Sequence, residues 1–275
     1  MTQNRMNLKG LLSLMAAALI CTFCCSKRQN ADTSAASGKY GGWQTFSHQN
    51  VRIVYPPGHP LEADIPEMAA RYVVSIERNC RFFEMPVPVE TLVVMYYSGF
   101  GQGPELTGRQ YPFAFGDTIH FWLPSFLGPT LMQYLLPKWQ NIEPKYPFLK
   151  HGLIALLDYS GQNYHSMTQR YLNEGNLIHL AALAADTAVS SDTERYQSAE
   201  AASFVDFVAT YFGIKGLEIL YRARAPFESA VQGIFMMPVD SLEKLWLGFV
   251  NDVAPKDTAT TGSDSRSGSE SAGGG

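Results

Sequence analysis

Histidine spacing is the first feature of this sequence to examine for chemistry, since imidazole is both a metal ligand and a proton carrier. The chain has six histidines. A zinc site on a single helix needs two imidazoles at i and i+4, with a glutamate beside the first as general base. No two histidines here are three or four residues apart, and HExxH does not occur. The sequence therefore predicts no zinc hydrolase, no bound metal and no other cofactor.

Single polar residues offer weaker candidates. His151 opens an apolar helical segment, and two interpretations stay open: a hydrogen-bonded, partly buried side chain, or a pocket group that binds a ligand or carries a proton. His120 lies within an apolar strand pattern and is interpreted as structural. Glu174 and Glu200 either face a cleft or lie exposed on loop and helix surfaces.

Nucleophilic catalysis has little support in the residue pattern. A serine nucleophile is expected on a tight turn such as G-x-S-x-G, and neither Ser98 nor Ser160 has those flanking residues. Cys80 is the single cysteine outside the N-terminal segment, and its helical setting predicts a buried structural thiol. The pattern predicts neither a serine nor a cysteine hydrolase.

The elements that must position these side chains change in type along the chain. Alternating or continuous apolar runs predict strands over 50–55, 91–97 and 117–122, and apolar residues at spacings of three and four predict a helix over 65–83. The glycine-rich stretch 98–108 lacks the spacing of a phosphate-binding loop and is predicted to be a hairpin or surface loop.

Helical periodicity dominates the second half of the chain. Helices are predicted over 129–136, 148–158, 167–171, 196–212, 216–223, 226–235 and 241–251. An early sheet with a helix, followed by a mostly helical half, is an α+β arrangement. We expect one such domain over residues 43–253.

The order of several segments resembles a known family. Residues 147–161 are similar to a P-x-L-x-E-G-L-A-x-Y segment, and residues 196–208 to a Y-x-x-A-x-S-F-V helix, with 173–183 between them as the connecting loop. Together these resemble the peptidase MA-like gluzincins, zinc peptidases with an HExxH helix and a glutamate ligand on a later helix. The resemblance covers most of the domain and implies a zincin-like fold.

The departures from that family pattern fall on its metal site. Thr130 and Tyr134 stand where the resemblance implies the two histidines, Leu131 stands at the catalytic glutamate, and His151 replaces the glutamate ligand. With Tyr196, these residues are the candidates for a vestigial cleft. The resemblance therefore implies a metallopeptidase-like domain without zinc ligands or a general base.

The N-terminal segment has the features of an export signal. Basic residues precede an apolar run of about 15 residues, which suits a signal sequence and is short for a membrane span. Three cysteines close this run and resemble the lipidation motif of bacterial lipoproteins, with Cys25 as the candidate; an uncleaved anchor and a secreted mature chain are the alternatives. We expect a leader over 1–25, a flexible tether over 26–42 and a disordered tail over 254–275.

Charge and composition limit the partners. The net charge of −4 and the absence of long basic runs argue against nucleic acid. The favoured expectation is a non-catalytic envelope domain, exported and membrane-tethered at the periplasmic or cell surface, that binds a peptide, an unknown envelope protein or a small ligand. The alternatives are a hydrolase with a rearranged site around His151 and a purely structural envelope lipoprotein.

Overall fold

Among the described residues, the helices and strands run from Gln44 to Val253. The structure, a computed structural model, describes residues 40–254 apart from 111, 122–126, 159–160 and 186–190; for 127 and 191–198 it describes the backbone alone. The predicted leader with Cys25, nearly all of the tether and all but the first residue of the tail lie outside the described residues.

A five-stranded mixed sheet forms the first half, in the order β1-β2-β3-β5-β4. The central strands β2, β3 and β5 are parallel, and the two edge strands run antiparallel to their neighbours. Their bounds are Gln44–His48 (β1), Val51–Tyr55 (β2), Leu92–Tyr96 (β3), Phe113–Phe115 (β4) and Thr118–Phe121 (β5).

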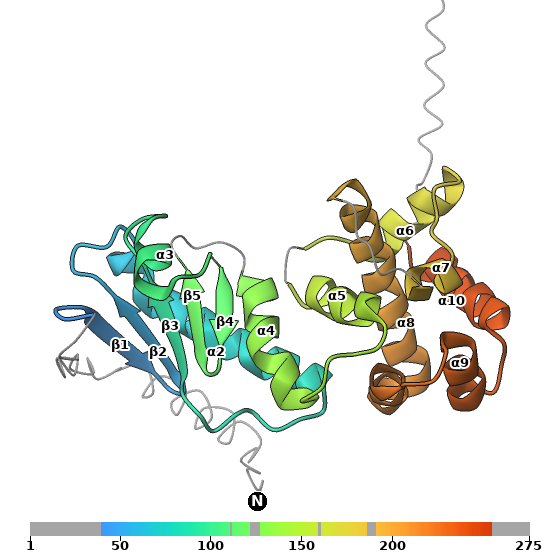
Figure 1. The fold of residues 1–275 in the computed structure, drawn as a ribbon, viewed down its shortest axis with the longest axis horizontal. Helices are drawn as coiled ribbons and strands as arrows, with labels where there is room; N and C mark the ends of the chain where they lie inside the picture. The colour runs from blue at the N-terminus through green and yellow to red at the C-terminus, as the bar shows by residue number, and fades with distance from the viewer. Residues whose placement is uncertain (1–39, 111, 122–126, 159–160, 186–190, 255–275) are drawn as a thin grey trace, which may run out of the picture.

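Two helices cover one face of this sheet. The crossover from β2 to β3 passes through a short 3-10 turn (Glu62–Asp64) and α2 (Ile65–Phe82), and α4 (Leu127–Trp139) lies beside α2 against β4 and β5 (Figure 1). Apolar residues at helical spacing bury one face of α2, including Cys80. The prediction of a buried thiol is confirmed, and burial raises the pKa of Cys80 to about 11.

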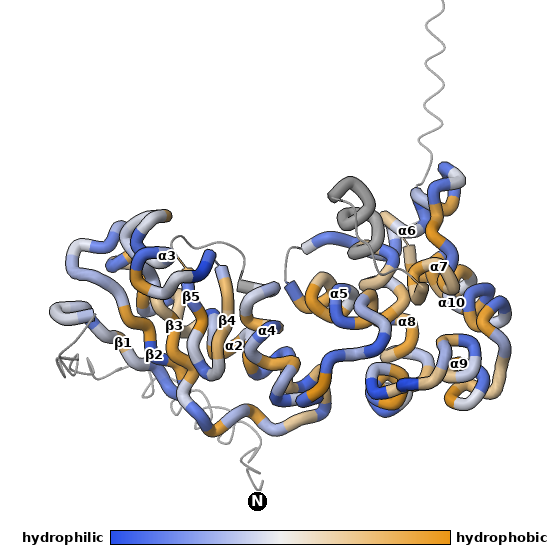
Figure 2. Tube along the Cα trace, in the orientation of Figure 1, coloured by the Kyte–Doolittle hydropathy of each residue, from blue (hydrophilic) through white to orange (hydrophobic). Residues whose placement is uncertain are grey.

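The second half is a bundle around one central helix. Its helices are α5 (Pro147–Leu156), α6 (Tyr164–Asn173), α7 (Leu180–Ala185), α8 (Ser191–Arg222), α9 (Phe227–Phe235) and α10 (Val239–Val253). α5, α6, α9 and α10 all pack against α8. Hydrophobic positions run along the strands and through α4, α5 and α8 (Figure 2), as a shared core requires.

Two glycines shape the central helix and its closest neighbour. Gly213 has φ +73° and ψ 169°, which interrupts the helical geometry of α8 and divides it into two segments. Gly152 on α5 approaches α8 so closely that an added Cβ would lie 2.4 Å from the Ala201 carbonyl oxygen. Glycine at this position therefore permits the close approach of α5 to α8.

The two halves meet at the end of α4. Trp139 stacks on Phe83 of the sheet half, with centroids 4.6 Å apart, and meets Tyr221 of α8 edge-on at 5.3 Å. In Figure 1, α4 accordingly lies between the sheet and the helical half. One continuous hydrophobic core joins them.

The predicted α+β class, with an early sheet and a late helical half, is confirmed. The glycine-rich stretch was predicted as a loop and is corrected: it contains α3 (Gln102–Thr107), which ends at Gly108 in the left-handed conformation. A proline in the first turn and a glycine at the end suit a short helix. The edge strands β1 and β4 were also missed, because neither contains a fully buried residue and so neither shows a strong apolar pattern.

Candidate functional site

A cleft of ≈ 300 Å³ opens where α4 faces the helical half. Residues of α4 at helical spacing form one wall, and the loop after α4, α5 and α8 supply the rest. The lining residues are Gln133, Leu136, Pro137, Gln140, Asn141, Ile142, Glu143, Lys150 and Tyr221. Amide side chains and apolar residues both line this surface, a combination suited to a peptide-like ligand.

The cleft adjoins the edge of the sheet. Gln133 lines the cleft, and its Oε1 accepts a hydrogen bond of 3.2 Å from the backbone N–H of Ala114 on the edge strand β4. That N–H points away from β5, where a further strand would pair. A side-chain amide therefore takes the position of a neighbouring strand's carbonyl.

Pro137 changes the hydrogen bonding of the same wall. It lies inside α4 and has no backbone N–H. It therefore cannot donate the i→i−4 bond to the Gln133 carbonyl that another residue would make. Pro137 lies on this wall beside the side-chain amides of Gln133 and Gln140.

The charges in the cleft are paired. Lys150 donates to Glu143 at 2.7 Å, and Gln140 Nε2 donates to Glu218 at 3.1 Å. Burial, with a smaller contribution from Glu143, raises the pKa of Tyr221 to about 12, so its phenol is neutral at physiological pH. The lining accordingly carries hydrogen-bonding groups with little net charge.

The predicted cleft residues do not line this cleft. Thr130, Leu131 and Tyr134 are buried within α4's packed side, and His151 is partly buried on α5 beside Lys150. Tyr196 belongs to α8, and its side chain lies outside the described residues. The exposed i, i+4 pair of α4 is Gln133 and Pro137, three residues further along the helix than predicted.

Tyr134 points toward the sheet half instead. Burial is the main cause of its raised pKa, and Asp117, Glu90 and Cys80 add to it. Lys138 Nζ lies 4.9 Å from the centroid of the Tyr134 ring. The Tyr134 hydroxyl has no hydrogen-bond partner among the described residues. Tyr134 is therefore a core residue in contact with the base of the sheet.

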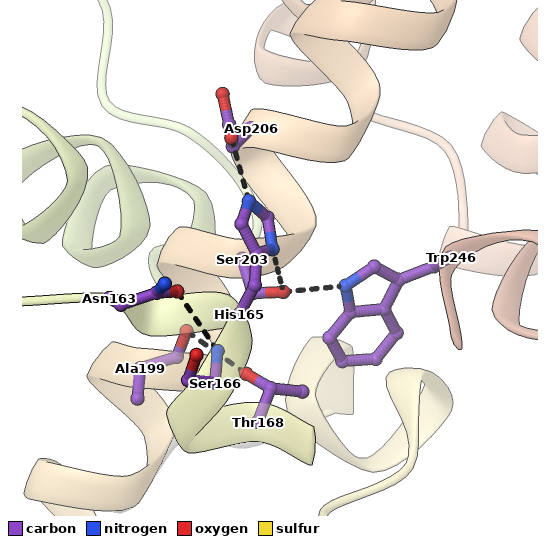
Figure 3. A network of polar contacts seen from close by, with 8 residues as sticks. All are labelled: Asn163, His165, Ser166, Thr168, Ala199, Ser203, Asp206 and Trp246. Carbon is purple, nitrogen blue, oxygen red and sulfur yellow. Dashed lines mark hydrogen bonds and ion pairs between the residues drawn. The ribbon is translucent and has the colours of Figure 1, made fainter. Parts of the chain in front are cut away.

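A second polar network lies in the helical half, where three helices meet (Figure 3). His165 of α6 contacts two residues of α8: Ser203 Oγ lies 3.0 Å from its Nδ1, and Asp206 Oδ2 lies 2.8 Å from its Nε2. Trp246 of α10 donates its indole N–H to the same Ser203 Oγ at 3.0 Å. The network includes a serine, a histidine and an aspartate in hydrogen-bond contact.

This serine is not arranged as a nucleophile. Ser203 has no exposed surface, and the indole of Trp246 occupies its Oγ. It also lies inside a helix, where backbone N–H groups bond within the helix and are not free to stabilise an oxyanion. The arrangement joins α6, α8 and α10, because each polar group satisfies another within the packed interior.

A buried carboxyl group lies one turn before Ser203 on α8. Glu200 was predicted to be cleft-facing or exposed; it is fully buried. Its Oε1 accepts from the Ile178 N–H at 2.8 Å, and its Oε2 has no partner among the described residues. Burial, opposed by that hydrogen bond and by His179, raises the pKa of Glu200 to about 7. Glu174, by contrast, is exposed.

A second carboxylate holds the same loop. Glu243 of α10 lies 2.7 Å from His179 Nδ1 and accepts the Leu180 N–H at 2.7 Å, at the start of α7. The hydrogen bond and charge of Glu243 raise the pKa of His179. Two carboxylates from α8 and α10 thus fix the loop between α6 and α7.

Sequence reasoning missed Gln133, Gln140 and the Ser203 network. The proline and glutamine of α4 stand four residues apart, a spacing visible in the sequence, but no motif marks amides as ligands. His165 is 38 residues from Ser203, so only the fold brings them together.

The described residues contain neither a candidate metal cluster nor a helix that could span a membrane. No group of three or more His, Cys, Asp or Glu side chains there could hold a metal ion. None of the helices in that part of the chain is long and apolar enough to cross a membrane. No protein-family model, no curated protein and no solved structure matches the chain.

Proposed function

We propose that this chain is a non-catalytic, metallopeptidase-like envelope domain that binds an extended peptide in the cleft between α4 and the helical half. The single observation that carries the proposal is the hydrogen bond from Ala114 N–H to Gln133 at the margin of the cleft. An edge strand is a template for a further strand, and peptides commonly bind by that route. In the free protein, the side chain of Gln133 accepts the hydrogen bond from Ala114 N–H that an added strand would otherwise accept.

The lining of the cleft supports binding over hydrolysis. Gln133, Gln140 and Asn141 can pair with peptide N–H and C=O groups, whereas the two charged groups, Lys150 and Glu143, are paired with each other. General acid–base catalysis needs a free titratable group within reach of the substrate. The predicted lipoprotein leader would hold such a binding domain at a membrane surface.

A labelled peptide of about eight alternating Thr and Val residues is a suitable probe, because it is long enough to follow a strand. We expect binding of the full chain to this peptide, and at least about tenfold weaker binding when alternate peptide nitrogens are methylated, which removes strand pairing. Fluorescence anisotropy measures both affinities.

Ala114→Pro removes the outward N–H at a position where an edge strand tolerates proline. It should weaken the peptide complex by about tenfold, while Ala114→Ser, which keeps the N–H, should bind as the wild type does. Equal binding by the two variants would refute strand addition. Stoichiometric zinc in the purified chain, with peptide cleavage abolished by EDTA, would refute the non-catalytic part of the proposal.

A further inference from the structure

A second recess lies on the far side of the Gln140–Glu218 hydrogen bond from the cleft. It is a groove of ≈ 620 Å³ between the last segment of α8 and α9. Its lining residues are Lys215, Glu218, Ile219, Arg222, Ala223, Arg224, Ala225, Ser229, Ala230, Gly233 and Ile234. The lining combines two isoleucines with small residues of α9 and of the turn before it.

The apolar walls of this groove are partly uncovered. Ile219 is 55% exposed, and Ile234 is half-buried. Ala230 is buried on α9, and the exposed Gly233 one turn later has open space where a Cβ would be. An open recess with an exposed isoleucine and neighbouring small residues can accept an apolar side chain from outside.

The rim of the groove is positively charged. Lys215, Arg222 and Arg224 contribute three positive charges against one negative charge from Glu218, a net of +2, whereas the whole chain carries −4. Exposed Lys215 and Arg222 both form ion pairs with Glu218: Lys215 Nζ lies 2.7 Å from one carboxylate oxygen, and the Arg222 guanidinium lies 3.6 Å from the other. Shared between two cations, Glu218 neutralises only one of them.

The turn that closes the groove is held in place. Lys145 Nζ donates to the carbonyl oxygens of Arg224 and Ala225 at 2.9 and 3.0 Å. The cation of Lys145 therefore lies close to the same end of the groove. A preformed groove costs less ordering free energy on binding than one that must form around its ligand.

We infer that the α8–α9 groove docks an acidic amphipathic helix of a partner protein, with apolar side chains between Ile219 and Ile234 and carboxylates facing Lys215, Arg222 and Arg224. Charge complementarity selects the acidic partner. The recess lies between two helices, and a third helix can pack along such a recess. The predicted C-terminal tail is excluded as occupant, since residues 255–275 contain no large apolar side chain. This site is separate from the peptide cleft and does not depend on it.

The test uses a fluorescent helical peptide with Leu at i, i+3, i+4 and i+7 and Glu at the other positions, and a matched peptide with Lys in place of Glu. We expect the full chain to bind the Glu peptide at least about tenfold more tightly than the Lys peptide, with affinity falling as salt is added. Arg222→Glu should weaken binding of the Glu peptide and reduce the salt dependence.

Gly233→Leu fills the groove from an exposed position and should weaken binding of the Glu peptide by at least about tenfold. Gly248→Leu is the matched control, because Gly248 is also an exposed helical glycine with open space around its Cβ, on α10. It should bind within about twofold of the wild type. If circular dichroism shows that Gly233→Leu is unfolded, Ile219→Asp at the exposed wall decides in its place.

Equal affinity for the Glu and Lys peptides, or unchanged binding by Gly233→Leu, would overturn the inference. Binding to anionic phospholipid vesicles that Arg222→Glu abolishes, without binding to the Glu peptide, would overturn it in favour of a membrane-contact surface. The Ala114 variants should not alter binding to the groove, so failure here and failure of the peptide cleft are distinguishable.

Discussion

The sheet half and the helical half both bury an ionisable side chain, with opposite consequences for stability. His120 in β5 has a pKa lowered to about 4, by burial and by the nearby Arg109. Glu200 in α8 has a pKa raised to about 7, mainly by burial. Desolvation favours the neutral form in both cases. The sheet half would therefore hold a buried positive charge only at acid pH, and the helical half a buried negative charge only above about pH 7.

The surroundings explain why each group stays neutral. His120 stacks on Phe113 with centroids 4.2 Å apart, and its Nδ1 lies 2.8 Å from the Tyr97 hydroxyl. Glu200 has one backbone N–H and no partner on its second oxygen among the described residues. Neither group lies against an opposite charge strong enough to offset burial.

The largest expected effect tests whether the two halves unfold as one unit. Gly152→Ala places a Cβ 2.4 Å from the Ala201 carbonyl oxygen, so α5 must move away from α8. We expect a loss of about 3 kcal/mol in the free energy of unfolding, the upper end of the usual cost of overpacking, because the added Cβ meets backbone atoms. Urea unfolding followed by tryptophan fluorescence and by circular dichroism should shift together if the shared core couples the halves.

Gly248→Ala is the control for this change. Nothing lies within 4 Å of its added Cβ, so helix propensity alone should act and stabilise the chain by up to about 1 kcal/mol. A Gly152→Ala protein as stable as the wild type would contradict the close packing of α5 on α8. Separate transitions by the two probes would show that the halves unfold independently.

The next effect concerns the helical half at high pH. Because folding raises the pKa of Glu200 from 4.5 to about 7, its contribution is fully present below pH 4.5 and is lost as pH rises through 7. Glu200→Gln, neutral at every pH, should therefore be more stable than the wild type at pH 8 by about 2 to 3 kcal/mol and similar near pH 5. Urea denaturation at both pH values measures the difference.

Exposed Glu174 supplies the control for Glu200. Glu174→Gln should change stability little at either pH, since surface substitutions are usually within about 0.5 kcal/mol. If Glu200→Gln lowered stability equally at pH 5 and pH 8, Glu200 would be ionised in the folded protein at both, contrary to its burial.

A smaller effect of opposite sign is expected in the sheet half. Folding lowers the pKa of His120 from 6.5 to about 4, so its contribution is fully present above pH 6.5 and is lost as pH falls toward 4. His120→Gln should be more stable than the wild type at pH 4.5 by about 1 to 2 kcal/mol, relative to their difference at pH 7. Urea denaturation at pH 4.5 and pH 7 measures that change.

The exposed His179 is the matched control, because its pKa is raised and its stabilisation is lost as pH rises. His179→Gln should therefore give no gain at acid pH. A His120→Gln protein with the same acid sensitivity as the wild type would place the titrating group elsewhere in the chain.

The residue pattern was sufficient for the elements with strong periodicity. Apolar residues recur at spacings of three and four over residues 65–83, and α2 spans Ile65–Phe82. The apolar runs of β3 and β5 were equally clear, because most of their residues are buried, and β2 was marked by the alternation of buried and more exposed positions. The short strand β4 and helix α3 carry too few buried residues to produce a periodic signal.

The candidate site shows where such patterns are insufficient. The sequence located α4 and its helical period, yet both sides of α4 pack against other elements, and its rotation about its own axis decides which side opens to solvent. That rotation follows from tertiary contacts with α2, β4 and α5, which the periodicity of α4 itself does not specify. Thr130 and Tyr134 consequently lie in the core, whereas Gln133 and Pro137 face the cleft.

The same distinction applies to the chemistry of the chain. The absence of HExxH and of paired histidines is a property of local spacing, and local spacing can be read directly from the sequence. The pairing of His165 with Ser203, the burial of Glu200 and the hydrogen bond of Gln133 to β4 depend on long-range packing. Side chains far apart in the chain meet only when burial of the apolar core brings their helices and strands together.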